Sequence, residues 1–258
     1  MWIFCCGPRR SGSTLQYNIV REILERNSLG KVVDYCFPDE FPGVYEANKD
    51  IAGFKLFKSH ELTTLMREMI NDDEAVAISC FRDLRDVIVS IANKEGYSAS
   101  YIAKKKLMVK DYIHYYNEVK ALPNSYISKY EDFYANIVDE CRNISKFLNL
   151  PINDSQFEEI SQKLSYKNKN ELLSSEEFVK FEGQNSKEYM IDKKTLVHSN
   201  HFGNIHPSSY KKSLKKETIY YIESEGGLWL LQRGYKVSFK GLVSYFVNLI
   251  KSNLGLKK

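Results

Sequence analysis

The first stretch of the chain whose residue types could do chemistry is "GPRRSGST", Gly7 to Thr14, which follows the apolar run Trp2–Cys6. A strand that passes through a glycine turn into a helix presents several backbone N–H groups, and the positive end of the helix dipole, to one anion. Ser11, Ser13 and Thr14 add hydroxyl donors. The stretch predicts a phosphate-binding loop, and an ordinary glycine turn is the alternative.

The loop departs from that of the nucleotide triphosphatases at one position. Their motif places a lysine after the second glycine, where it reaches the β- and γ-phosphates. Here Ser13 follows Gly12, and the basic residues Arg9 and Arg10 come before the glycine. We therefore expect the loop to hold a phosphate other than a magnesium-bound γ-phosphate.

A histidine follows the second strand-like stretch, "GFKLFKS", within the segment "KSH", Lys58 to His60. A histidine whose pKa is near neutrality, at the carboxyl edge of a strand, can take a proton from a hydroxyl group. We expect His60 to be such a base, and a purely structural histidine is the alternative.

In "FRDLRDVIVS", Phe81 to Ser90, which directly follows an apolar run, a serine comes eight positions after an arginine. Arg82 would leave the tip of a strand, and Ser90 would come from the first turns of the next helix. Both side chains can then converge on one phosphate. The alternative is a salt-bridged surface turn made by Asp83, Arg85 and Asp86.

In this order, the three stretches resemble the motifs of the PAPS-dependent sulfotransferases, P-loop enzymes of cytosolic and bacterial type. The first is similar to the family's 5′-phosphosulfate loop, "KSH" to its Lys-Thr-His segment with the general base, and Phe81–Ser90 to its 3′-phosphate signature. "KYEDF", Lys129 to Phe133, resembles the Tyr-Glu-Asp segment, whose tyrosine lies near the adenine. For Tyr130 a core aromatic is the alternative.

The resemblance implies a reaction: transfer of a sulfuryl group from the cofactor PAPS to a hydroxyl group or amine of a small-molecule acceptor, with release of PAP and without a metal. The transfer would be in line, with His60 removing the acceptor's proton while Lys58 and Arg10 neutralise the developing charge. The residues implied to bind the cofactor are Arg9, Arg10, Ser11, Gly12, Ser13, Thr14, Arg82, Ser90, Tyr130 and Lys211.

Lys211 comes from the family's C-terminal signature, which is only partly kept. In "HFGNIHPSSYKKSLKKE" Tyr210 takes the usual tryptophan position, Lys211 is the best match for a 3′-phosphate contact, and the Arg-Lys-Gly triplet is absent. Three histidines of this region match no common zinc spacing, so we expect no metal there; they are His198, His201 and His206.

Strand-like and helical stretches alternate through the first half of the chain. Strands are expected over 2–6, 53–59, 75–81 and about 124–133, with a helix from about Ser13 and others between the later strands. This alternation predicts an α/β fold with a central parallel sheet covered by helices. With the resemblance, we expect a three-layer sandwich of P-loop topology, a helical C-terminal part, and one sulfotransferase domain over 1–258.

For the remaining parts of the chain the sequence predicts only the kind of structure, without individual site residues. Residues 139–189 are expected to form helices and polar loops, and the acceptor pocket to come from residues 30–50 and 155–200. The last stretch, from Phe239 to Lys258, has a helical apolar face. We expect that face to dock on its own domain or on a second copy of the chain in a homodimer, and a membrane-surface helix is the alternative.

The composition argues against a nucleic-acid-binding protein, a disulfide-rich protein and a membrane-spanning protein. The net charge of +4 on 258 residues is too small to indicate a nucleic-acid partner. Five cysteines, an odd number, predict buried thiols in a reducing compartment. No apolar run approaches a membrane span and no leader is recognised, so we expect a cytoplasmic enzyme, with a natural-product alcohol or amine as acceptor.

Two other functions remain open at the level of sequence. A nucleotide-dependent kinase would share the P-loop topology but would lack its usual lysine. A non-catalytic module that binds PAP or a glycan would keep the loop and transfer nothing.

Overall fold

The computed structural model describes residues 1–33, 36–106, 109–150, 153–165, 178–182, 188–192, 194–197 and 206–254. Their contacts divide the chain into two compact parts, each made of two segments. The first part is Met1–Phe81 with Val119–Phe202, and the second is Arg82–Glu118 with Gly203–Lys258. The expectation of a single domain stays a prediction.

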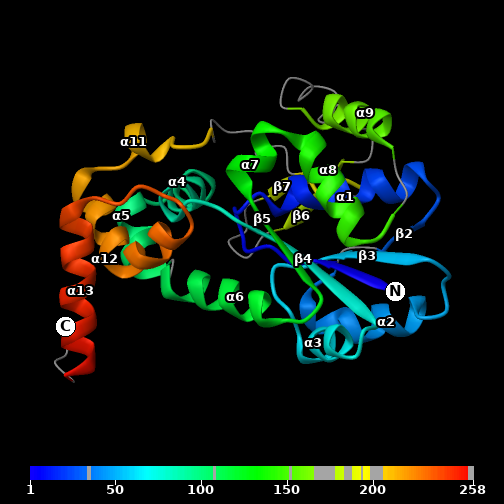
Figure 1. Cartoon of the computed structure of the whole chain (residues 1–258), viewed down its shortest axis with the longest axis horizontal. Helices are drawn as coiled ribbons and strands as arrows, with labels where there is room; N and C mark the ends of the chain where they lie inside the picture. The colour runs from blue at the N-terminus through cyan, green and yellow to red at the C-terminus, as the bar shows by residue number, and fades with distance from the viewer. Residues whose placement is uncertain are drawn as a thin grey trace. The chain divides into compact units, whose positions relative to one another are not determined.

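A five-stranded parallel sheet lies at the centre of the first part (Figure 1), as the β-then-α alternation predicted. Its strands follow the order β2 (Gly30–Val32), β3 (Phe54–Lys58), β1 (Trp2–Cys5), β4 (Ala75–Phe81) and β5 (Ser125–Lys129). In the register, Cys5 lies opposite Lys58 on β3 and opposite Ile78 on β4. Since all the strands are parallel, the residues that follow β1, β3 and β5 are brought to one edge of the sheet.

Helices cover both faces of this sheet (Figure 1). On one side lie α1 (Ser13–Arg26), α7 (Tyr130–Ala135), α8 (Ile137–Phe147) and α9 (Asp154–Leu164); on the other lie α2 (Phe41–Asn48) and α3 (Thr64–Asn71). Successive side chains of a strand point to opposite faces, so β1 contributes to both layers. Ile3 and Cys5 pack in the core beneath α1, while Trp2 and Phe4 contact the Phe41 ring of α2.

The second part is helical. It contains α4 (Leu84–Glu95), α5 (Ala99–Tyr101), a π-helical stretch (Ile102–Lys106), the first turns of α6 (Val109–Ala121), α11 (Tyr210–Ser213), α12 (Lys216–Gln232) and α13 (Phe239–Asn253). α12 is the central element of this part, since α4, the π-helical stretch and α13 all contact it. Among the described residues no helix is both long and apolar enough to cross a bilayer.

Some elements differ from those expected. The short edge strand β2 was not predicted, because three residues carry no readable alternation. Within 139–189, which was expected to hold only helices and loops, β6 (Phe178–Glu182) pairs antiparallel with β7 (Glu188–Asp192). The five cysteines are free thiols, and four of them are buried.

The C-terminal apolar face, made of Phe239, Leu242, Phe246, Leu249 and Ile250, was expected to be covered, and in the described part of the chain most of it is not. Phe239, Phe246, Leu249 and Ile250 are all exposed on α13. The helix packs on α12 through its other side, where Gly241 fits against Glu223 and Asn248 donates a hydrogen bond to the Ser224 carbonyl. The face that docks on α12 is therefore made by Gly241, Leu242, Tyr245 and Asn248, while most of the predicted apolar face stays exposed.

Candidate active site

The loop between β1 and α1 is a tight turn that closes on Pro8. The Ser11 amide and hydroxyl both donate to the Pro8 carbonyl, at 3.2 and 2.6 Å. α1 then begins at Ser13, and the first helical bonds are made by the amides of Leu15 and Gln16 to the Gly12 carbonyl. Ser11 therefore stabilises the turn, and its hydroxyl is directed inward.

The amides at the start of α1 remain able to bind an anion. Gly12, Ser13 and Thr14 donate their backbone N–H groups to no acceptor among the described residues. The first N–H groups of a helix have no intrahelical acceptor, and they lie at the positive end of the dipole. That these amides hold a phosphate stays a prediction.

Gly12 is the residue that allows this turn. Its φ of 98° lies in the left-handed region, and a Cβ atom built on it would be 2.2 Å from Cδ2 of Tyr130. Tyr130 is buried, and its ring packs edge-on against Phe133 with centroids 5.4 Å apart. Tyr130 thus lies directly against the loop and belongs to the core of the first part.

A lysine and a histidine from the end of β3 lie beside the loop. Lys58 is buried, and its Nζ donates to the Ser13 hydroxyl at 3.3 Å. The Nδ1 of His60 is 2.9 Å from the Gly7 carbonyl oxygen. Since a carbonyl oxygen can only accept, Nδ1 carries the proton, and in the neutral ring Nε2 keeps the lone pair.

A buried thiol lies beneath the loop. The Sγ of Cys80, on β4, is 3.2 Å from the Ser11 hydroxyl. Burial raises the pKa of the Cys80 thiol to about 12, so it stays protonated near neutrality. The loop is therefore backed by a neutral group, which does not repel a bound anion as a thiolate would.

Behind the loop, the first turn of α1 is held by a buried carboxyl group. Glu140, on α8, accepts hydrogen bonds from Gln16 at 3.2 Å, Ser128 at 2.7 Å and Tyr126 at 2.8 Å. Gln16 also donates to the Ser79 carbonyl at 2.9 Å. Glu140 was not among the predicted residues, because it lies 124 residues from Gln16 and no local pattern connects the two.

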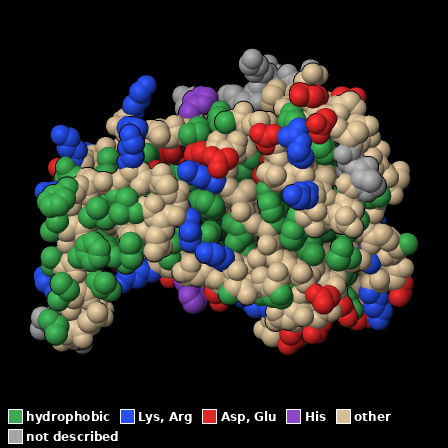
Figure 2. All heavy atoms as spheres, in the orientation of Figure 1, with side chains coloured by type: hydrophobic (Ala, Val, Ile, Leu, Met, Phe, Trp, Pro, Cys, Tyr) green, Lys and Arg blue, Asp and Glu red, His purple; other side chains and the backbone are tan. Residues whose placement is uncertain are grey.

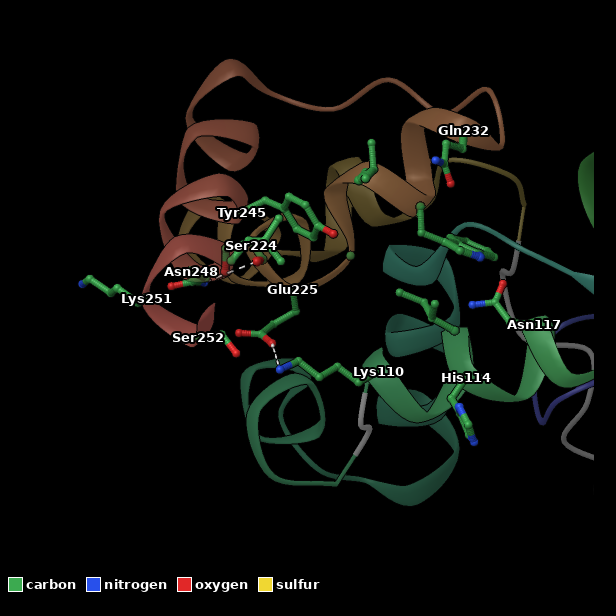
Figure 3. A pocket seen from close by; sticks show the side chains of 15 residues that line it. Lys110, His114, Asn117, Ser224, Glu225, Gln232, Tyr245, Asn248, Lys251 and Ser252 are labelled. Atoms are coloured by element: carbon green, nitrogen blue, oxygen red, sulfur yellow. Dashed lines mark hydrogen bonds and ion pairs between the residues drawn. The ribbon is translucent and has the colours of Figure 1, made fainter. Parts of the chain in front are cut away.

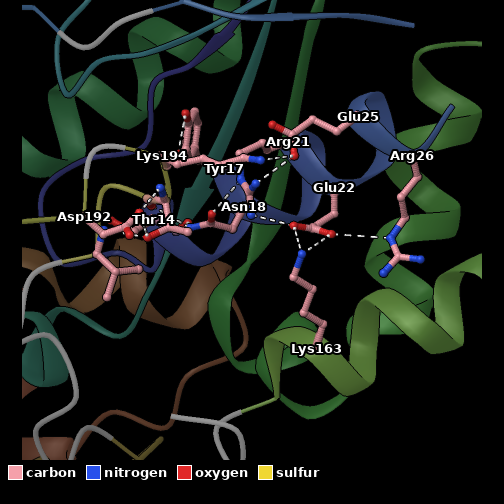
Figure 4. A network of polar contacts seen from close by, with 12 residues as sticks. Thr14, Tyr17, Asn18, Arg21, Glu22, Glu25, Arg26, Lys163, Asp192 and Lys194 are labelled. Carbon is pink, nitrogen blue, oxygen red and sulfur yellow. Dashed lines mark hydrogen bonds and ion pairs between the residues drawn. The ribbon is translucent and has the colours of Figure 1, made fainter. Parts of the chain in front are cut away.

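The rest of α1 is anchored by an ionic network (Figure 4). Arg21 and Glu22 are buried and paired, and Lys163 of α9 reaches both oxygens of Glu22 at 2.8 and 3.0 Å. Asn18 donates to the carbonyl of Thr195 at 2.8 Å. These contacts fix the helix whose N-terminus forms the loop.

Three of the predicted residues, Arg82, Ser90 and Lys211, belong to the second part of the chain, while Arg9 and Arg10 belong to the first. Arg82 and Ser90 are both buried, and the Arg82 amide donates to the Tyr112 hydroxyl at 3.0 Å. The charged residues between them do not form a surface turn: Arg85 is buried between Asp83 and Glu223, at 2.7 and 2.8 Å.

Asp86 ties α4 to the segment that carries Lys211. Its carboxylate accepts from the amides of Ser208 and Tyr210, at 2.7 and 2.8 Å, and from the Ser209 hydroxyl at 2.9 Å. Tyr210 is buried beneath the Arg85 guanidinium, while Lys211 is exposed. Asp86 therefore fixes the position of the backbone that carries Lys211.

A comparison with protein-family models matches the sulfotransferase domain over residues 2–203. The chain belongs to the sulfotransferase family. None of the curated proteins compared with the chain matches it.

Solved structures with the same fold share little sequence with this sulfotransferase. A mouse sulfotransferase complexed with PAP has a TM-score of 0.64 at 13% identity, with 96% of this chain and 87% of the other covered. Retinol dehydratase in complex with androsterone and the inactive cofactor PAP has a TM-score of 0.62 at 15% identity, with 92% and 82% covered. Its complex with retinol and PAP has a TM-score of 0.58 at 13% identity, with 92% and 83% covered. At these identities the likeness shows the fold.

The sulfotransferase also has a cleft of about 690 Å³ in its second part (Figure 3). It lies between α6, α12 and α13 and is lined by Lys110, His114, Trp229, Tyr245 and Asn248, among others. None of the predicted site residues lines this cleft. It therefore gives no support to the site predicted from sequence.

Two predictions reach outside the described residues. His198 and His201 lie there, as do large parts of 155–200, the segment expected to form the acceptor pocket. Within the described ranges, no cluster of three or more histidine, cysteine, aspartate or glutamate residues is placed to hold a metal ion.

Proposed function

We propose that this sulfotransferase transfers a sulfuryl group from PAPS to a hydroxyl group or amine of a small-molecule acceptor. The observation that carries the proposal is the grouping at one sheet edge of the loop amides, the buried Lys58 and the oriented His60. A nucleotide kinase of this topology would place a lysine where Ser13 stands. The family match supports sulfuryl transfer in general.

The proposed donor, PAPS, carries a phosphate at each end, and different predicted residues are assigned to each phosphate. The amides of Gly12, Ser13 and Thr14 would hold the 5′-phosphate, with Arg9 and Arg10 as neighbouring cations. Arg82 and Ser90 would hold the 3′-phosphate, as the motif resemblance implies, and Lys211 would add a cation whose position depends on Asp86. PAPS, when bound, supplies the sulfuryl group and leaves as PAP, as the cofactor named in the similar structures suggests.

The hydrogen bond of His60 supports its proposed role as the base. With Nδ1–H held by the Gly7 carbonyl, Nε2 is the ring nitrogen that can accept the proton of an acceptor hydroxyl group. Lys58, the last residue of β3, donates to the Ser13 hydroxyl at the start of α1 and would keep a positive charge close to the loop, where negative charge develops during transfer. Arg10, with its positive φ of 65° in the turn, is the second cation in this role.

The proposal is tested by the transfer of labelled sulfate from PAPS to a panel of small alcohols, phenols and amines. We expect His60→Ala to lose most of the turnover, by a factor of about 10² or more, with nearly normal PAP affinity. His60→Asn keeps a donor toward the Gly7 carbonyl without a base, and we expect it to be equally inactive. His114→Ala, at an exposed position on α6, is the matched control.

Two outcomes would contradict the proposal. Near-normal turnover in both His60 variants would remove the base assignment. PAP binding without transfer to any acceptor would favour the non-catalytic module, and phosphoryl transfer from ATP would favour the kinase.

A further inference from the structure

Helix α13 has one face that packs within the chain. Gly241 is buried against Glu223 of α12, and a Cβ at Gly227 of α12 would lie within 3.6 to 3.7 Å of Leu242 and Tyr245. Ser238 caps the helix through the Gly241 amide and bonds to the Glu223 carboxylate. These contacts fix which side of α13 faces away from α12.

The outward side carries a continuous apolar stripe. Residues three or four apart lie on one face of a helix, and the large exposed side chains of α13 repeat at that spacing. Figure 2 shows hydrophobic side chains gathered over α13, at the left of the view. The stripe residues, with their exposed fractions, are Phe239 (83%), Val243 (45%), Phe246 (49%), Ile250 (58%) and Leu254 (67%).

Positive charge borders this stripe, and the stretch of sequence that forms α13 contains no acidic residue. Lys240 and Lys251 are exposed on α13 and, at 100° per residue, fall on the same flank of the stripe. The sequence holds no aspartate or glutamate after Glu225, while six basic residues follow. They are Arg233, Lys236, Lys240, Lys251, Lys257 and Lys258.

We propose that the α13 stripe is a docking surface for an anionic lipid membrane. An amphipathic helix binds a membrane surface when a large apolar face is bordered by lysines that attract anionic headgroups. The apolar stripe would enter the headgroup and acyl boundary, and Lys240 and Lys251 would remain at the headgroups. This proposal goes beyond sulfuryl transfer and does not depend on it.

A second copy of the chain fits this surface less well. In a symmetric pair the same patch faces itself, so Lys240 and Lys251 of one copy would approach those of the other. Since no aspartate or glutamate follows Glu225, the segment itself offers no carboxylate to these lysines. Charge complementarity therefore favours an anionic lipid.

The test is co-sedimentation of the purified full chain with vesicles of phosphatidylcholine alone or with about one third phosphatidylglycerol. We expect binding to the anionic vesicles only, and less of it at high salt. Phe246→Ser with Ile250→Ser should weaken binding about tenfold or more, since several buried CH₂ groups are lost. Lys240→Gln and Lys251→Gln should each weaken it about fivefold.

Controls separate this proposal from its rivals. Phe37→Ser, at an exposed phenylalanine of the first part, should leave vesicle binding unchanged. Sedimentation equilibrium without lipid measures self-association of the wild type and of the double serine variant. No binding to anionic vesicles, equal binding to neutral ones, or a dimer that the double variant dissociates would each overturn the proposal, the last in favour of a second copy.

Discussion

At the scale of single residues, Glu140 is the buried acid that holds the start of α1, and three side chains donate to it. Burial raises its pKa, although the hydrogen bonds from Ser128, Tyr126 and Gln16 oppose this. The folded state therefore binds this proton more readily than the unfolded state does. The free energy of unfolding should fall as the pH rises from the ordinary glutamate pKa through the raised one.

Glu140→Gln should remove the pH-dependent contribution of this carboxyl group to the free energy of unfolding. In urea unfolding between about pH 4.5 and 8, the free energy of unfolding of the wild type should fall relative to that of the variant as the pH rises. Glu68→Gln, at an exposed position on α3, is the matched control. A difference that stays constant with pH would show that Glu140 does not titrate differently in the folded protein.

Arg82 is the residue on which donor affinity should depend most. If its guanidinium binds the 3′-phosphate, Arg82→Ala loses a charge-assisted contact worth about 1.5 to 3 kcal/mol, so the dissociation constant for PAP should rise about 10- to 100-fold. Titration calorimetry measures this, with the partly exposed Arg142→Ala as control. An unchanged constant would remove Arg82 from the site.

At the scale of elements, the turn from β1 into α1 requires a glycine at position 12, because helix α7 packs against it and leaves no room for a side chain. Gly12→Ala would place a Cβ in the left-handed region and 2.2 Å from Tyr130 of α7. We expect a loss of about 2 to 4 kcal/mol in urea unfolding, from strain and overpacking together. Gly43→Ala on α2, where nothing lies within 4 Å of the new Cβ, should be neutral or slightly stabilising.

A second substitution separates the two causes. If steric conflict with Tyr130 contributes, the loss from Gly12→Ala should be smaller in a Tyr130→Ala background, because neighbouring substitutions are not additive. Equal losses in the two backgrounds would assign the whole effect to backbone strain.

At the scale of the whole molecule, ligand binding should appear as thermal stability. PAP at about 100 times its dissociation constant should add about 2.7 kcal/mol, which for a chain of this size is a rise of about 5 to 10 °C in Tm. Differential scanning calorimetry with PAP and with ATP separates the sulfotransferase from a kinase. Protection by ATP and not by PAP would contradict the proposed donor.

Sequence alone was sufficient for the family, for four strands of the parallel sheet and for the residues around the loop. Those features depend on local signals: apolar runs of strand length, a glycine turn at a helix start, and charged residues directly after a strand. Ser13, Lys58 and His60 could be named because each stands at a strand or helix end, where a parallel sheet gathers side chains.

Only the tertiary structure decided which groups support that loop and which face of the last helix is covered. Glu140 reaches Gln16 across 124 residues, and Gly241 rather than the apolar stripe meets α12. Periodicity shows that a helix has two faces, but the choice between them depends on the shape and polarity of a distant partner. A contact between residues far apart in the chain produces no recognisable pattern in either sequence segment, so only the tertiary structure shows it.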